Sequence, residues 1–324
     1  MAEFERIRRF FAPLTQNFAG AANLTDDVAI VPSSANGWII STDSLVEGVH
    51  FLYNTPPEDI AWKALGVNYS DLAAKGAAPC YYFLNLALPA HISNSWVENF
   101  ARGLGAAQQC WGGILSGGDS VTSKQEITIS ITALGKNNGR VPRRDGAQIG
   151  DMVWVSGTLG DGAAGLLCQQ GKIALGAGHE YLVHRYTRPT PRLQLAAILQ
   201  QYATAAMDIS DGLLGDLAHI ACYSGVNIEV MAEQLPLSKE LRQHCPPLQA
   251  LDLASTGGDD YEIVFTAPLQ AQATIKAAAE KLPFAITSIG RVVATEPEAA
   301  QKYLLRLLNA EGGNITPHRW GWEH

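Results

Sequence analysis

The alternation of hydrophobic and polar residues divides the chain into strands and helices. Short stretches in which apolar residues alternate with polar ones, or run together, are typical of β-strands. Four such stretches predict strands: Gly37–Thr42, Tyr81–Leu88, Glu126–Leu134 and Met152–Ser156.

Longer segments between these strands repeat their apolar residues at helical spacing. Residues 57–76 begin with a proline, carry apolar residues on one face and end with a glycine, as expected for a capped helix. Further helices are predicted around Trp96–Ala107, at 191–202 and at 270–282. Strands that alternate with helices predict an α/β fold.

The most polar and glycine-rich interruption of this pattern is Lys136–Asp151, which predicts a domain boundary. A chain of 324 residues also exceeds the usual size of one hydrophobic core. We therefore expect an N-terminal domain over residues 1–138 and a C-terminal domain over residues 139–324. Ser-Thr-Asp and Gly-Gly-Asp in the first half have counterparts in the second, Asp-Ile-Ser-Asp-Gly and Gly-Gly-Asp-Asp, which indicates two related halves.

Composition narrows the class of protein. Hydrophobic residues make up 47% of the chain and charged residues 17%, which is typical of a globular protein. The N-terminal residues carry acids as well as arginines and lack the apolar core of a signal peptide, so we expect a cytoplasmic location. A formal net charge of −8 argues against a nucleic-acid-binding protein.

Six short acidic clusters, each next to an apolar stretch, are the most informative feature. We expect Asp43, Asp119 and Asp208 at the carboxyl ends of buried strands, where ligands bind in open α/β sheets. A single cluster of this kind is more often a helix N-cap or a turn, but six together favour a shared site. The clusters are Thr25–Asp27, Ser41–Asp43, Asn68–Asp71, Gly117–Asp119, Asp208–Gly212 and Gly257–Asp260.

Carboxylates gathered in a partly dry cleft repel one another, by about 4 kcal/mol at ~4 Å and an effective dielectric constant near 20. Cations relieve this repulsion. Oxygen ligands without a cysteine or histidine cluster favour magnesium, which commonly shares its carboxylate ligands with phosphate groups and water.

Two glycine pairs add a second constraint on the site. Gly117–Gly118 and Gly257–Gly258 lack Cβ atoms, so their backbone can adopt positive φ and present N–H groups to phosphate oxygens, although a simple turn would also explain them. Neither the P-loop pattern nor the protein-kinase glycine loop occurs in the chain. An ATP site would therefore depend on metal ions.

Five blocks, in this order, resemble the thiamine-monophosphate kinase family, which belongs to a superfamily with aminoimidazole ribonucleotide synthetase. They are STDSLVEGVHF at 41–51, KALGVNYSDLAAKGAAP at 63–79, SGGDSV at 116–121, DISDGLLGDL at 208–217 and GGDDYEI at 257–263. The resemblance implies a two-domain α/β (α+β) fold like that of aminoimidazole ribonucleotide synthetase. Its N-terminal domain would bind ATP and metal and form a homodimer, and its C-terminal domain would cover the active cleft.

The resemblance also implies roles for individual residues. The catalytic residues, acting through metal, would be Asp43, Asp119 and Asp211. ATP would contact Gly118, Asp119, Arg144 and Ser210, and thiamine monophosphate would contact His50, Asp259 and Trp322. Several magnesium ions would be held by Asp27, Ser41, Thr42, Asp43, Asp71, Asp119, Asp208 and Asp211.

Some of these residues have a second interpretation. His50 could be a core histidine that packs beside Phe51. Trp322 could pack the last segment against the protein instead of facing a cationic thiazolium. Trp111 could stack on adenine, but most aromatic residues of this kind are core residues. Four departures from the family pattern occur. Thr25 replaces the usual glycine, Asp259 replaces the usual glutamate, Lys75 replaces a common methionine, and the last residues, 322–324, lack the usual final phenylalanine.

The chemistry implied by the resemblance is ATP-dependent phosphorylation of a phosphate monoester. Its oxygen is already anionic at neutral pH, so no general base is needed, and catalysis requires in-line positioning and positive charge. Arg144 would add a planar donor for phosphate. The alternatives are another ATP-dependent enzyme of the superfamily, of the aminoimidazole ribonucleotide synthetase or selenophosphate synthetase type, and a noncatalytic nucleotide and magnesium sensor.

Overall fold

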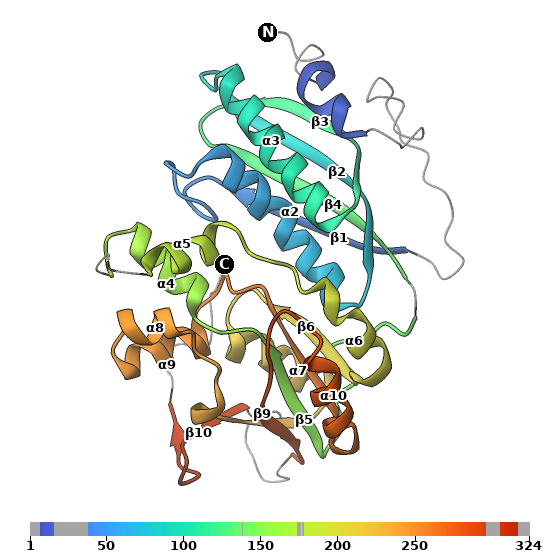
Figure 1. Ribbon diagram of the computed structural model, residues 1–324, viewed down its shortest axis with the longest axis vertical. Coiled ribbons are helices and arrows are strands. Elements are labelled where there is room, and N and C mark those ends of the chain that lie inside the picture. Colours follow the sequence, from blue (N-terminus) through green and yellow to red (C-terminus); the bar gives the residue numbers. More distant parts are fainter. Residues whose placement is uncertain are drawn as a thin grey trace. The chain divides into compact units, whose positions relative to one another are not determined.

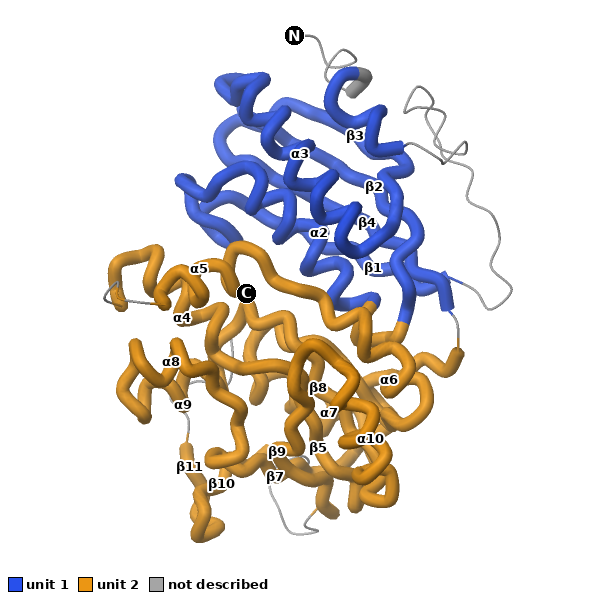
Figure 2. Tube along the Cα trace, in the orientation of Figure 1, with its two compact units in different colours: residues 1–72, 77–138 blue, residues 73–76, 139–324 orange. Residues whose placement is uncertain are grey.

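The computed structural model describes residues 7–15, 38–137, 139–173, 176, 178–295 and 305–316. Two compact units divide the chain (Figure 2). Unit 1 comprises residues 1–72 and 77–138, and unit 2 comprises residues 73–76 and 139–324. Both units combine helices with a sheet, which confirms the predicted α/β class.

Unit 1 is built on a four-stranded sheet in the order β1-β4-β2-β3. β2 and β3 are parallel, and the other neighbours are antiparallel. Two long helices cover one face of this sheet (Figure 1). The elements are β1 (Trp38–Val46), α2 (Pro57–Ala74), β2 (Ala78–Pro89), α3 (Asn94–Trp111), β3 (Ile114–Ser123) and β4 (Thr128–Lys136), after the short turns of helix Ile7–Phe11 and Ala12–Thr15.

The caps of the two helices follow from their sequence. α2 starts at Pro57 with two acidic residues in its first turn, and Gly76, just beyond its end, has a φ of 66°. α3 starts after Ser93, whose hydroxyl accepts a hydrogen bond from the Trp96 N–H at 3.2 Å, and it is followed by the C-cap Gly112, which has a φ of 81°.

The strands of unit 1 alternate between a helix-covered face and an open face. In β4, Ile129, Ile131 and Ala133 are buried, whereas the threonines and serine between them are less so. Ile40 of β1 and Val121 of β3 leave 61% and 52% of their surface exposed. The open face is therefore partly apolar, and α2 and α3, the two long helices of unit 1, lie on the opposite face of the sheet.

The expectation that Asp43 and Asp119 end their strands is wrong. β1 continues from Asp43 to Val46, because its polar and apolar residues keep alternating in register with β4 as far as the Val46–Thr128 pair. β3 continues past Asp119 to Ser123, paired with β2. Both aspartates therefore lie inside strands, whereas Asp208 does lie at the end of its strand, β6 (Ala205–Ile209).

Unit 2 contains a seven-stranded sheet in the order β11-β10-β7-β9-β5-β8-β6, in which β10 and β7 are parallel and the other neighbours antiparallel. Its remaining strands are β5 (Asp151–Ser156), β7 (Asn227–Met231), β8 (Glu262–Pro268), β9 (Ile286–Val293), β10 (Leu305–Leu308) and β11 (Asn314–Ile315). Its helices are α4 (Asp161–Gln169), α5 (His179–Thr187), α6 (Ala196–Tyr202), α7 (Leu213–Ser224), α8 (Lys239–His244), α9 (Pro247–Thr256) and α10 (Gln272–Ala279).

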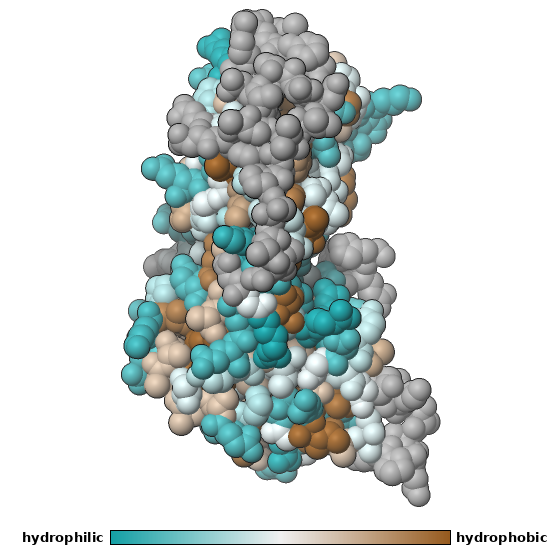
Figure 3. Space-filling model, turned by 90° about the vertical axis from the view of Figure 1, so that its right-hand side faces the viewer, coloured by the Kyte–Doolittle hydropathy of each residue, from teal (hydrophilic) through white to brown (hydrophobic). Residues whose placement is uncertain are grey.

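Separate apolar clusters hold the helices of unit 2. α7 contributes Leu213, Leu214 and Leu217 to one cluster, and α6 and α10 contribute to another with Trp154 and Phe265, whose rings stack 6.4 Å apart. A third cluster joins α4, α5, α8 and α9. Of the helices in the described part of the chain, none is both long and apolar enough to cross a membrane. On the surface shown in Figure 3, hydrophobic side chains form small groups among hydrophilic ones.

Candidate functional site

One edge of the unit 1 sheet brings together three of the predicted metal ligands. The Ser41 hydroxyl donates a hydrogen bond to the Asp71 carboxylate, which joins β1 to the C-terminal half of α2. The Asp43 N–H donates to Asn68 Oδ1 at 3.1 Å, and Asn68 is itself held by Ala64 O at 2.9 Å. Ser41, Asp43 and Asp71 are all half-buried. Their carboxylate and hydroxyl oxygens are the donor types that suit magnesium.

Thr42 faces the other side of the sheet. Successive side chains of a strand point to opposite faces, so Thr42 points away from its neighbours Ser41 and Asp43. Its hydroxyl lies 3.0 Å from that of Thr132 and 3.2 Å from Ile131 O, both on β4. The structure therefore does not bring the Thr42 side chain to the Asp71 group.

Asp119 lies on the opposite edge of the sheet. Across the strands, Asp119 is in register with Asn85, Ser130 and Ser44, whereas Asp43 is in register with Gly118. β1 and β3 are separated by three strand spacings of about 4.8 Å each, or roughly 14 Å. Asp43 and Asp119 of one chain therefore cannot bind the same ion.

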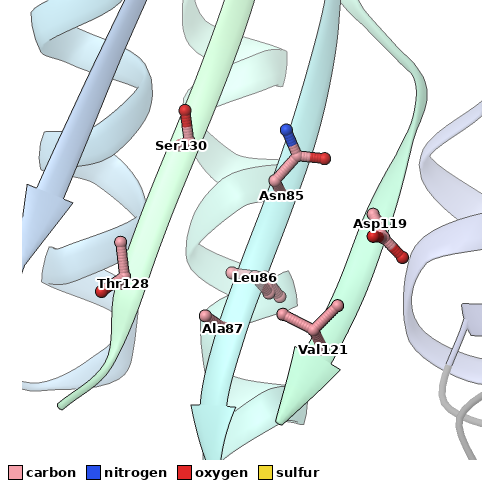
Figure 4. A pocket seen from close by; sticks show the side chains of 7 residues that line it. All are labelled: Asn85, Leu86, Ala87, Asp119, Val121, Thr128 and Ser130. Carbon is pink, nitrogen blue, oxygen red and sulfur yellow. The ribbon is translucent and has the colours of Figure 1, made fainter. Parts of the chain in front are cut away.

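The surroundings of Asp119 form a small hollow on the open face. Asn85, Leu86 and Ala87 of β2, Thr128 and Ser130 of β4, and Val121 line it together with Asp119 (Figure 4). The Asp119 carboxylate is exposed and accepts the Ser120 N–H at 2.8 Å. Among the described residues, no three His, Cys, Asp or Glu side chains lie close enough to hold a metal ion.

Gly118 is required by the sheet itself. Its φ is 150°, and a Cβ at this position would overlap the carbonyl oxygen of Leu84 on β2. The predicted positive φ is therefore present in this glycine pair, and the close approach that the structure records is to the neighbouring strand.

In unit 2, the Asp208–Gly212 loop connects β6 to α7 and rests on a buried carboxylate. Asp216 Oδ2 accepts the N–H groups of Ser210 and Asp211 at 3.1 and 3.2 Å. Burial, with a contribution from the Asp211 charge, raises the pKa of Asp216 to about 7. Asp208 is buried and Asp211 is half-buried.

The Gly257–Tyr261 loop lies against the Asp208–Gly212 loop. The N–H groups of Asp259 and Tyr261 donate to Ser210 O and Ile209 O at 2.9 and 2.8 Å. The expectation of positive φ at the glycine pair is wrong here, because Gly257 has a φ of −75° and the left-handed residues are Asp259, at 68°, and Tyr261, at 50°. A glycine is required at position 258 because the two loops approach closely there: a Cβ on Gly258 would lie 2.6 Å from Ser210 O.

The remaining predicted site residues have separate surroundings. The His50 ring is half-buried, and its Nδ1 accepts the Val46 N–H at 3.0 Å, which leaves the ring proton on Nε2. Arg144 is exposed. Trp111 packs edge-on against Trp62 at 4.5 Å, as expected of a packing residue. Thr25, Asp27 and Trp322 lie outside the described residues.

Three residues that support these loops were missed from the sequence. Asp216 and Asp260 lie within the quoted blocks, and their spacing from Asp211 and Asp259 was a signal that could have identified them. Arg185 gave no signal, because nothing in the sequence HEYLVHRYT relates it to a distant carboxylate.

Comparison with protein families matches both halves of the chain. Residues 25–137 match the model described as AIR synthase related protein, N-terminal domain, and residues 148–302 match the model for the C-terminal domain. The predicted two-domain fold of the aminoimidazole ribonucleotide synthetase type is thereby confirmed.

Relatives and solved structures agree with these models. The chain is 38% identical to thiamine-monophosphate kinase of Caulobacter vibrioides, over 99% of this chain and 90% of the relative. A crystal structure of thiamine-monophosphate kinase from Stenotrophomonas maltophilia K279a superposes with a TM-score of 0.83 at 40% identity, covering 97% of this chain and 98% of the other. The structure of AaThiL complexed with AMPPCP and TMP superposes with a TM-score of 0.77 at 36% identity, covering 99% and 96%. Hydrogenase maturation protein HypE, at 20% identity and a TM-score of 0.81, shares the fold.

Proposed function

The chain belongs to the thiamine-monophosphate kinase family, and we propose that it transfers the γ-phosphoryl group of ATP to the phosphate of thiamine monophosphate, giving thiamine diphosphate and ADP. The observation that carries this proposal is the 38% identity to a thiamine-monophosphate kinase over 99% of the chain. The alternatives, another synthetase of the superfamily or a noncatalytic sensor, are not favoured by these relatives.

The proposed acceptor is an anionic phosphate oxygen, so the protein has to position two anions and offset their repulsion. Magnesium, when bound, supplies positive charge for this purpose. We assign its ligands to Ser41, Asp43 and Asp71 on one edge of the unit 1 sheet, Asp119 on the other edge, and Asp208 and Asp211 in unit 2. Asp27 and Thr42 complete the proposed set, with Thr42 limited to its backbone oxygen by the orientation of its side chain.

The nucleotide and substrate contacts are also proposals. ATP would contact Gly118, Asp119, Arg144 and Ser210, among which the exposed Arg144 has a guanidinium that is accessible to phosphate. Thiamine monophosphate would contact His50, Asp259 and Trp322. The Nε2–H of His50 can donate a hydrogen bond to a phosphate oxygen.

We further propose that the protein acts as a cytoplasmic homodimer. The partly apolar open face of the unit 1 sheet, with Ile40 and Val121 exposed, is a surface that a second copy would bury. A second copy would also supply the Asp119 edge to the Asp43 edge of its partner, because the two edges of one sheet are too far apart to share an ion.

The function is tested by incubating the purified protein with ATP, magnesium and thiamine monophosphate and measuring thiamine diphosphate and ADP by chromatography. We expect equal amounts of the two products, and none when EDTA is present. ADP release with an aminoimidazole ribonucleotide synthetase or selenophosphate synthetase substrate, and none with thiamine monophosphate, would overturn the proposal.

A further inference from the structure

The backbone of the Gly257–Tyr261 loop is strained at the residue proposed to bind substrate. Asp259 and Tyr261 have left-handed φ values of 68° and 50° without being glycines. Such residues are strained, and they persist where the surrounding structure holds them. The loop therefore needs anchors in addition to the two main-chain hydrogen bonds that join it to the Asp208–Gly212 loop.

The first anchor is Asp260, whose side chain is buried at the start of α4. Its two side-chain oxygens accept the N–H groups of Gly160 and Gly162, at 2.7 and 3.0 Å. These N–H groups lie at the N-terminal end of the helix, so the Asp260 side chain caps it. A Cβ on Gly162 would overlap the carbonyl group of Asp259, so the loop and the helix start are in direct contact.

The second anchor is Arg185 of α5, which is 7% exposed. One of its guanidinium nitrogens, Nη2, donates to the main-chain oxygen of Asp260 at 3.1 Å and to Glu262 Oε1 at 2.8 Å. Its Nε lies 3.8 Å from the buried carboxylate of Asp161 on α4. A single side chain thus ties the main chain directly after Asp259 to α4, α5 and β8.

Tyr186, the residue that follows Arg185, lies close enough to Asp259 to be affected by its charge. Tyr186 is buried, and its pKa is raised by that burial and, secondarily, by the negative charge of Asp259. The Tyr261 hydroxyl lies 3.4 Å from Asp259 Oδ1. Asp259 is therefore placed near two phenol groups as long as the loop keeps its conformation.

We propose that Arg185 is a positioning residue for thiamine monophosphate: by holding the main chain of Asp260 and the carboxylate of Glu262, it fixes the left-handed conformation in which Asp259 is presented to the substrate. This inference rests on the proposed function and on the assignment of Asp259. It predicts that loss of Arg185 weakens binding of thiamine monophosphate and has little effect on ATP.

Arg192 offers a matched control within the same network. It also binds Glu262, with its Nε 2.6 Å from Oε2, and its guanidinium lies over the ring of Phe284 at 4.6 Å. In the described part of the chain, its bonds go to Glu262 and not to Asp260. Replacing Arg192 therefore removes a half-buried partner of the buried Glu262 without removing the bond from Arg185 to the loop.

The experiment compares Arg185→Met and Arg185→Lys with Arg192→Met and Arg192→Lys. KM is measured for thiamine monophosphate and for ATP separately, the Kd of thiamine monophosphate is measured by calorimetry, and chemical unfolding gives the stability of each variant. We expect Arg185→Met to raise the KM and Kd for thiamine monophosphate roughly 10-fold or more, with the KM for ATP within about 3-fold of wild type. Arg185→Lys should give a smaller increase, since its ammonium keeps a charged donor for Glu262 but lacks the planar guanidinium whose Nε also lies beside Asp161.

The Arg192 variants should lose stability while the KM for thiamine monophosphate stays within about 2-fold of wild type. If Arg185→Met does not fold, Arg185→Lys alone carries the comparison. An unchanged KM for thiamine monophosphate in a folded Arg185 variant, or an equal increase in the Arg192 variants, would overturn the inference. The proposed function would still stand in that case, because it depends only on the activity of the wild type. A wild type that forms no thiamine diphosphate would overturn the proposed function and this inference together.

Discussion

Asp211 and Asp216 form a pair of carboxylates in which one supports the other. Asp216 holds the backbone N–H groups of Ser210 and Asp211, and the charge of Asp211 adds to burial in raising the pKa of Asp216 to about 7. This repulsion is the kind of local cost that a bound cation would relieve. The loop is therefore built at some expense of stability for the proposed metal-binding role.

Asp211→Asn tests this role. We expect kcat to fall by about 100-fold or more, because a metal ligand is lost. In EDTA the variant should be at least as stable as wild type, since the repulsion with Asp216 is removed. Glu229→Gln is a suitable control, because Glu229 lies on β7, four strand positions from β6, where it pairs with Arg291 of β9. Retained turnover in Asp211→Asn would contradict the assignment of Asp211.

Asp260 predicts a pH dependence of stability. Burial, with a contribution from Asp161 and against the opposing effect of Arg185, raises the pKa of Asp260 from 3.8 to about 8. Between these values the folded protein keeps a proton that the unfolded chain has released. The contribution of this group to the free energy of unfolding is therefore greatest at low pH and falls as the pH rises to about 8.

The measurement is urea unfolding of wild type and Asp260→Asn in EDTA at several pH values from 5 to 9. The asparagine cannot titrate, so the difference in unfolding free energy, wild type minus variant, should fall up to about pH 8 and then level off. A difference that stays constant or rises with pH would mean that Asp260 is already ionised in the folded protein.

At the scale of elements, the pairing of β2 with β3 depends on Gly118. Its φ of 150° excludes most residues, and the Leu84 carbonyl oxygen occupies the space of a Cβ. Gly150 has a φ of 92° and no atom within 4 Å of the position a Cβ would take. An alanine at position 150 therefore shows the cost of the backbone strain alone, without a steric overlap.

Gly118→Ala should therefore lower the free energy of unfolding by about 3 kcal/mol or more, whereas Gly150→Ala should lower it by about 1–2 kcal/mol. Chemical unfolding of both variants against wild type gives the two values. Equal effects would show that the contact with Leu84 contributes nothing beyond the backbone strain.

The sequence predicted elements well where local chemistry determines them. α2 begins at Pro57 as predicted and ends two residues before Gly76, because proline and glycine act locally on helix ends. The later helices are shorter than predicted: α6 starts only at Ala196, after a turn of 3-10 helix at Leu193–Leu195, and α10 covers Gln272–Ala279.

Strand order and buried ion pairs could not be predicted, because they depend on residues far apart in the chain. Arg185 is an example, since its partners Asp161 and Glu262 lie 24 residues before it and 77 residues after it.

At the scale of the whole molecule, the strand order constrains how the proposed metal site is assembled. Ser41, Asp43 and Asp71 lie at the β1 edge, and Asp119 lies at the β3 edge on the open face. If both edges serve one reaction, two chains have to contribute. A homodimer would then contain two composite sites, each with the β1 edge of one chain and the β3 edge of the other.

Mixing inactive variants tests this arrangement. Asp43→Asn and Asp119→Asn should each be inactive alone. In a mixed dimer, one site carries both substitutions and the other carries neither. Because half of the dimers formed by random exchange are mixed and each has one intact site, co-expression should restore about a quarter of wild-type turnover.

The matched control is a mixture of Asp43→Asn with Asp71→Asn. These residues lie on the same edge of the same chain, so each site of the mixed dimer keeps one substitution and no activity returns. Turnover is measured as thiamine diphosphate formed per chain after exchange, with the fraction of mixed dimers determined by native mass spectrometry. Activity from the second mixture, or none from the first despite mixed dimers, would mean that Asp43 and Asp119 do not act across two chains.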